Sequence, residues 1–201
     1  MNFVIIDNLL QIVLLMTCAV LAAFFGLRYR ARQLLILSLS YACFATGTVY
    51  YVLHVAICGT APQIFYVSEI SWIAAYIFIL SIQILRSEGI RLSFSIVAAA
   101  PALVYSCGAM YYQIMLYMTL LFVAAAGAIM YISIWRLYNN VKGQALDICS
   151  ICCLMLQLTL YLSSFLMRDF LHFNLYFALD IALSLSFAAL LPISLREVRR
   201  K

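Results

Sequence analysis

The residues that could carry chemistry are few and stand among apolar neighbours. Asp180 lies inside an apolar stretch at 174–195, and Glu69 lies near the start of another at 67–85. An ionisable side chain inside a bilayer is costly and is a functional candidate by default. Four more ionisable residues fall near the same ends of apolar stretches: His54, Arg168, Asp169 and His172. We expect all six in the outer half of the membrane.

Helical spacing gives each of the two acids companions on its own face. Glu69 is followed by Trp72 at i+3 and by Tyr76 at i+7. Asp180 is followed by Ser184 at i+4 and by an aromatic residue at i+7. Residues with these spacings share one face of a helix. The two faces are predicted to line one outward-facing pocket, suited to a small polar or cationic ligand or to a coupling proton.

Polar side chains from other stretches extend this hypothetical pocket. Gln157 adds a hydrogen-bonding group, as does Tyr50 or Tyr51. The candidate ligand-binding residues are Glu69, Trp72, Tyr76, Asp180, Ser184, Gln157, Arg168 and His54.

Several candidates have a structural alternative. Asp180 would staple the bundle if it paired with Arg168, and Glu69 would face water if it lay at the membrane interface. His54 and His172 lack the i, i+4 spacing that would favour a zinc site, so no metal ion is expected.

The seven cysteines do not predict a cofactor site. The motif Cys149-x-x-Cys152-Cys153 resembles a metal or redox site, but on a transmembrane helix it is typical of small apolar packing. Cys58 and Cys107 both fall near the outer face, where a disulfide is an open alternative.

The elements that must position these residues are transmembrane helices. Hydrophobic residues make up 68% of the chain and charged residues 9%, whereas a soluble domain is roughly half apolar and about a quarter charged. A spanning helix needs about 20 apolar residues. Seven stretches qualify: Asn8–Leu27, Gln33–Ile57, Val67–Leu85, Leu92–Met110, Gln113–Trp135, Ile148–Met167 and Asn174–Leu195. The predicted fold is an all-α seven-helix bundle in a single domain, 1–201, with the lipid bilayer around it.

The division between the fourth and fifth helices rests on length, because 92–135 carries no charge. As a single helix this stretch would be about 66 Å long, twice the thickness of the hydrocarbon layer. We expect a corner at Ser106-Cys107-Gly108 with Tyr111, Tyr112 and Gln113, where tyrosines suit the membrane interface.

The basic residues predict the orientation. With seven helices, eleven of the twelve Lys and Arg residues fall on one side and only Arg168 falls on the other. The positive-inside rule then places the N-terminus outside and the C-terminus in the cytoplasm. The expected location is the inner (plasma) membrane of the cell. Because the basic clusters lie between apolar runs, nucleic-acid binding is not expected.

An internal duplication is also predicted. The segments that begin at Glu69 and Asp180 each open on an acid, carry an aromatic seven residues later and end in Leu-Arg followed by Glu. Repeats 8–85 and 113–195 joined by a linker helix, 92–110, would explain this pattern. Both repeats would run in the same direction, with the site between the halves.

Motifs for enzyme chemistry are absent from the sequence. No Gly-x-Ser-x-Gly, His-Glu-x-x-His or phosphate-binding loop occurs. A retinal protein would need a lysine in the last helix, and the only lysines are Lys142 and Lys201. We expect neither an enzyme nor a cofactor.

The segment Ser68-Glu69-Ile70-Ser71-Trp72, with Tyr76 beyond it, resembles the membrane sensory regions that precede histidine kinase or diguanylate cyclase domains in bacteria. The resemblance covers about two helices, and no effector domain follows Lys201. It implies a free-standing input module that senses a ligand at the outer face and needs a separate signalling partner.

Three hypotheses follow. The first is a sensor-like protein that binds a small ligand, as a homo-oligomer or with a signalling partner. The second is a small-solute or proton-coupled transporter that uses Glu69 and Asp180. The third is a structural subunit of a membrane complex.

Overall fold

Seven helices make up the regular structure of the described chain. The computed structural model describes residues 3–59, 66–88, 90, 93–112, 116–166 and 172–199. The helices are α1 (Phe3–Arg28), α2 (Arg32–Cys58), α3 (Tyr66–Arg86), α4 (Ile96–Tyr112), α5 (Leu116–Tyr138), α6 (Gln144–Leu166) and α7 (Leu175–Arg199). Six of them, all but α4, are long and apolar enough to cross a membrane. The chain is therefore a multi-pass membrane protein.

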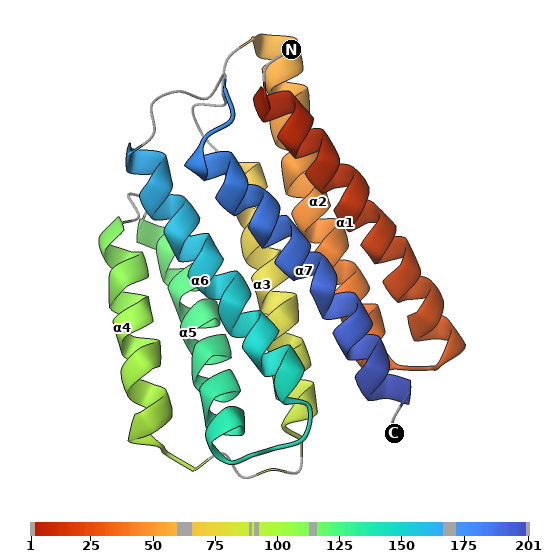
Figure 1. Cartoon of the computed structure of the whole chain (residues 1–201), viewed down its shortest axis with the longest axis vertical. Helices are drawn as coiled ribbons and strands as arrows, with labels where there is room; N and C mark the ends of the chain where they lie inside the picture. Colours follow the sequence, from red (N-terminus) through yellow and green to blue (C-terminus); the bar gives the residue numbers. More distant parts are fainter. Residues whose placement is uncertain are drawn as a thin grey trace.

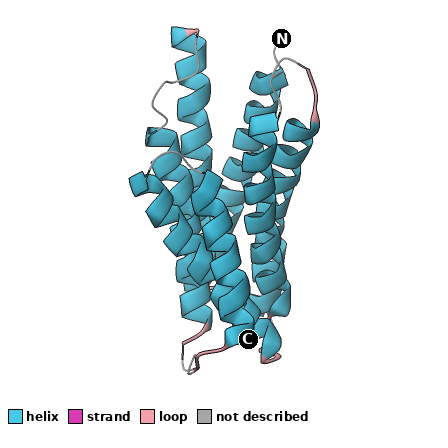
Figure 2. Ribbon diagram, turned by 90° about the vertical axis from the view of Figure 1, so that its left-hand side faces the viewer, coloured by secondary structure: helices cyan, strands magenta, loops and turns pink. Residues whose placement is uncertain are grey.

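Six helices form a closed ring, and the seventh lies outside it (Figure 1). Each helix of the ring contacts the next in the order α1, α2, α3, α5, α6 and α7, and α7 in turn contacts α1. The 17-residue α4 packs on α5 and touches α6 only lightly. Figure 2 shows the helices running lengthwise, with the chain termini at opposite ends of the bundle.

The two ends of the bundle differ in charge. Every Lys and Arg that the structure describes lies at the end that holds the C-terminus: Arg28, Arg30, Arg32, Arg86, Arg136, Lys142, Arg196 and Arg199. Asp7, Glu69 and Asp180 lie toward the opposite end, which we call the N-terminal end. The predicted segregation of basic residues therefore holds for the described part of the chain, while Arg168 lies outside it.

Three helices run further than predicted, each over an acidic residue. α1 begins before Asp7, α6 begins before Asp147, and α7 continues past Glu197. In the sequence, a predicted membrane helix stops where a charged residue interrupts the apolar stretch. In the structure, each of these acids has a polar partner within the bundle, so the helix continues past it. This is why the predicted boundaries fell short.

The corner between α4 and α5 also differs from its prediction. Ser106–Gly108 lie inside α4, which continues to Tyr112. α4 begins at Ile96 and not at Leu92. The connection to α5 falls at 113–115, outside the described residues.

An ion network joins the helices at the C-terminal end, and Arg86 is its centre. Arg86 Nη1 donates to Asp147 Oδ1 at 2.8 Å, and Nη2 donates to Glu197 Oε1 at 2.9 Å. Arg136 Nε reaches Asp147 Oδ2 at 3.2 Å. The side chains of Arg86 and Arg136 are 3% exposed and that of Asp147 is 0% exposed. A buried charge is tolerated when it is paired and its hydrogen-bonding groups are satisfied.

Uncharged amides and hydroxyls complete the ion network. Gln83 Oε1 accepts from Arg86 at 2.8 Å, while Gln83 Nε2 donates to Ser133 and Ser150. Gln33 of α2 donates to Glu197 at 3.4 Å. The network therefore ties α2, α3, α5, α6 and α7 together.

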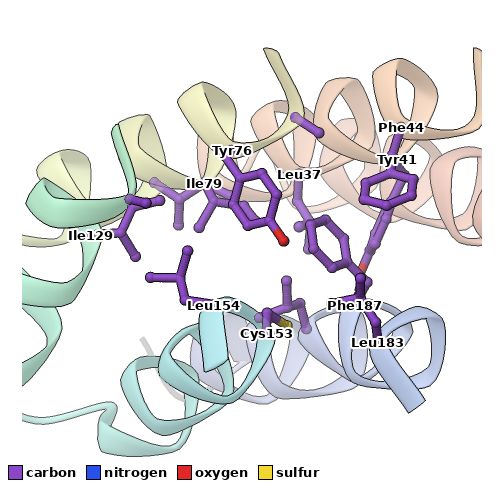
Figure 3. Close-up of a cluster of buried hydrophobic side chains, with 14 of the residues drawn as sticks. Leu37, Tyr41, Phe44, Tyr76, Ile79, Ile129, Cys153, Leu154, Leu183 and Phe187 are labelled. Atoms are coloured by element: carbon purple, nitrogen blue, oxygen red, sulfur yellow. The ribbon is translucent and has the colours of Figure 1, made fainter. Parts of the chain in front are cut away.

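Between the two ends lies an apolar core that includes the buried side chains of Tyr41 and Tyr76 (Figure 3). Tyr41 donates its hydroxyl hydrogen to the carbonyl oxygen of Phe187 at 2.8 Å. The ring of Phe187 packs on Phe44 at 4.9 Å and on Tyr76 at 5.5 Å. These contacts join α2, α3 and α7 near the middle of the bundle.

Gly143 provides a test of the ion network. It has a φ of +91°, and a Cβ there would collide with Glu197 Oε1 and Arg86 Nη2. Gly59 has a φ of +70° with nothing within 4 Å of such a Cβ, so it is a matched control. Gly59→Ala should lower the unfolding free energy by about 1 to 2 kcal/mol through backbone strain alone. Gly143→Ala should lower it by about 3 kcal/mol or more, because it also disrupts buried ion pairs.

The measurement is unfolding of the purified protein in detergent, followed by helical circular dichroism. Equal losses in the two variants would show that the ion network does not depend on the close approach at Gly143.

Candidate functional site

Two acids from opposite ends of the sequence meet at the N-terminal end of the bundle. The carboxyl groups of Asp7 in α1 and Asp180 in α7 are neighbours that interact electrostatically. Asp7 is 4% exposed, and its Oδ2 has no hydrogen-bond donor among the described residues. The contact follows from the packing of α1 on α7. A carboxyl pair of this kind can hold a proton or another small cation.

Local sequence fixes where α7 begins and so where Asp180 points. The side-chain oxygen of Asn174 accepts from the backbone N–H of Tyr176 at 2.9 Å and of Phe177 at 3.4 Å. This is the N-cap role that asparagine fills well. Asp180 then falls on the second turn, on the side of α7 that faces α1.

Gln11 connects the acid pair to deeper polar groups. Its Nε2 donates to Asp180 Oδ1 at 3.3 Å and to Ser184 Oγ at 2.9 Å. Its Oε1 accepts from Thr48 Oγ1 at 2.7 Å. Gln11, Thr48 and Ser184 are all buried. We call Asp7, Gln11, Thr48, Asp180 and Ser184 the acid-pair cluster.

The acid-pair cluster contains no positive charge. Each described salt bridge belongs to the ion network at the other end of the bundle. Within the described residues, neither Asp7 nor Asp180 has a basic partner. The predicted staple between Asp180 and Arg168 involves a residue outside the described part of the chain.

Two predicted site residues meet below the acid-pair cluster. Tyr76 donates its hydroxyl hydrogen to Gln157 Oε1 at 3.0 Å, which joins α3 to α6. The rings of Tyr76 and Phe187 are in contact, so the two predicted acid-and-aromatic faces do meet at their aromatic ends. Trp72 packs on Phe44 at 6.2 Å.

Glu69 and His54 are not joined to the acid-pair cluster. Glu69 is half-buried on the first turn of α3 and forms no hydrogen bond or ion pair with the described residues. His54 lies beside the ring of Tyr50 at 6.1 Å on the last turns of α2. Of the two described acids singled out in the sequence, Glu69 and Asp180, the structure places Asp180 in a polar cluster, while Asp169 lies outside the described residues.

Sequence reasoning missed Asp7, Gln11 and Thr48. Asp7 immediately precedes the predicted first helix, Asn8–Leu27, so the helical spacing of that stretch does not include it. The signal was present, because Asp7 and Gln11 are four residues apart and share one face of α1.

Metal ligation and disulfides find no support in the described residues. No group of three or more His, Cys, Asp or Glu side chains there could hold a metal ion. All seven cysteines are free thiols, including Cys58 and Cys107. Cys149 Sγ donates to the carbonyl oxygen of Ser186 at 3.3 Å, in line with a packing role.

Comparison of the chain with family models, curated proteins and solved structures gave no match.

Gln11 offers a test of the acid-pair cluster against a control on its own helix. Gln11→Leu removes two donated bonds and one accepted bond between helices. It should lower the unfolding free energy by about 1 to 2 kcal/mol, since each such bond in a membrane contributes roughly 0.6 kcal/mol. Asn8 donates only to Val4 within α1. Asn8→Leu should change stability by less than about 0.5 kcal/mol.

Thermal unfolding in one detergent would compare the two variants. A Gln11→Leu protein as stable as Asn8→Leu would show that Gln11 does not bridge the helices.

Proposed function

We propose that the chain is a membrane transporter for a small polar or cationic solute, with its binding site between two three-helix units. The first unit is α1–α3 and the second is α5–α7, with α4 as the linker. In such a repeat α1 corresponds to α5 and α3 corresponds to α7. The contact between α3 and α5 then has a counterpart between α7 and α1, and both contacts are present. This supports a parallel repeat, in which substrate sites lie at the interface of the halves. We call the interface between the units the seam.

The observation that carries the proposal is that the acid-pair cluster lies on the seam. Asp7, Gln11 and Thr48 come from the first unit, whereas Asp180 and Ser184 come from the second. Uncompensated acids inside a membrane mark ion and substrate pathways. A cationic group would supply the positive charge that the cluster lacks.

The ion network closes the same seam at the other end. It joins Gln33 and Arg86 of the first unit to Arg136, Asp147 and Glu197 of the second. We place this basic end in the cytoplasm by the positive-inside rule, in the plasma membrane. The acid-pair cluster then faces outside while the cytoplasmic end is held shut, an arrangement suited to alternating access.

Sensing is a second candidate, supported by the packing of the segment that resembles bacterial sensory regions. Ser68 donates to the carbonyl oxygen of Gly47 at 3.0 Å, and Tyr76 touches Phe187 across the seam. Gly47 leaves room for Trp72, because a Cβ there would lie 2.9 Å from Trp72 Nε1. A ligand at the acid-pair cluster would therefore act on α3 through the Phe187 ring.

Transport and sensing differ in whether the ligand crosses the membrane. A thermal-shift screen with small amines, amino acids and sugars would identify ligands, since binding raises the melting temperature by mass action. Uptake of each ligand found would then be measured in proteoliposomes. We expect Asp180→Asn to fold normally and lose uptake by about tenfold or more. Glu88→Gln, an exposed acid at the other end, should leave uptake unchanged.

Binding without uptake would support sensing and overturn transport. If no ligand binds and Asp180→Asn only lowers stability, the acid-pair cluster is structural and both functions fall.

A further inference from the structure

We infer that Asp7 and Asp180 bind a single proton between them, so that the proton is itself a ligand of this protein. Its use as the coupling ion rests on the proposed transport function, whereas the binding is argued from the position of the two acids and from the hydrogen bonds of Gln11 beside them. The proton joins an oxygen of one carboxyl group and is donated to an oxygen of the other.

A hydrogen bond between the two acids requires a hydrogen, and no described side chain donates one to Asp7 Oδ2. Carboxyl groups can share a hydrogen bond only when one of them is protonated. Asp7 Oδ2 is buried and finds no donor among the described residues. A proton held between the acids satisfies this oxygen.

Among the described residues no basic side chain pairs with either acid, and we assign the neutralising role to a bound cation. Asp147 and Glu197, at the other end of the bundle, are neutralised by arginines. Two phenols lie near the acid pair: Tyr76 interacts electrostatically with Asp180, and Tyr176 interacts with both acids. Two adjoining carboxylates would repel strongly in this apolar setting.

The hydrogen bonds of Gln11 favour a proton over a metal ion. Its amide nitrogen, and not its oxygen, faces Asp180 and Ser184. The amide oxygen already accepts from Thr48. A metal ion would need oxygen ligands here and would instead meet an N–H donor. A carboxyl group that holds a proton accepts that donor without conflict.

The acid pair lies within reach of water at the N-terminal end. Asp7 is four residues from the start of α1 and Asp180 is five from the start of α7. At helical rise these positions are about 6 to 8 Å deep. Release of the proton to that side leaves two carboxylates, whose repulsion would part α1 from α7 and open the seam.

Infrared spectroscopy of the full chain in lipid nanodiscs tests the inference, because a protonated carboxyl group has its own carbonyl band that shifts in deuterated water. The wild-type protein should show such a band that titrates as one proton. Asp7→Asn and Asp180→Asn should each remove it, because the new amide donates to the remaining carboxylate. The variant with both substitutions should lose no more of the carbonyl band intensity than either single variant does. Glu69→Gln and Glu88→Gln should retain the band.

The non-additive pattern is the signature of a shared proton. Additive losses would mean two independently protonated acids, and a band untouched in the double variant would mean no proton in the pair. Loss of the band on adding sodium at constant pH would assign the site to a metal cation. Each of these results overturns the inference. The Asn variants are near-isosteric, and circular dichroism checks that they fold.

The same preparations separate this inference from the proposed transport function. A shared-proton band without solute uptake would leave proton binding intact and refute transport. If solute uptake persists in protein that lacks the carbonyl band of the shared proton, transport would be supported, but without coupling to this proton.

Discussion

A carboxylate carried into a bilayer needs a partner that cancels its charge, and this requirement organises both ends of the bundle. At the C-terminal end, Arg86 and Arg136 neutralise Asp147 and Glu197. At the N-terminal end, Asp7 meets Asp180 and no described basic side chain joins them. Among the described residues, one end is thus electrostatically complete and the other is not. The proposed ligand site lies at the end where the described charges are not balanced.

The two clusters act on the same interface. Both lie on the seam between α1–α3 and α5–α7, and the core between the two ends of the bundle is built from buried aromatic and aliphatic side chains (Figure 3). The ion network holds the units together at one end with many simultaneous hydrogen bonds. The acid-pair cluster joins them at the other end through the hydrogen bonds of Gln11 and through the two acids that we infer to share a proton. A change of charge there would alter the seam at one end only.

Much of the fold was predictable from the sequence, but most of the site was not. An apolar stretch of about 20 residues in a membrane is expected to form a spanning helix, so the helices could be predicted from the sequence. The end that carries the basic residues could be predicted from their positions between these stretches. The pairing of the acids could not be predicted in this way, because a charged residue beside an apolar stretch is expected to face water unless its partner in the folded chain is known. Asp7 and Asp147 were lost in this way, while Asp180 was found because it lies inside its stretch. The Tyr76–Gln157 bond depends on the ring order that places α6 against the seam.

The central claim is that the acids of α1 and α7 lie against each other across the seam. Cysteine cross-linking tests it in a background that lacks the seven native cysteines. Asp7→Cys combined with Asp180→Cys should form a disulfide readily in native membranes. Asn8→Cys with Asp180→Cys should not, since the next residue of α1 points about 100° away around the helix. Equal cross-linking in both pairs, or none in the first, would contradict this account.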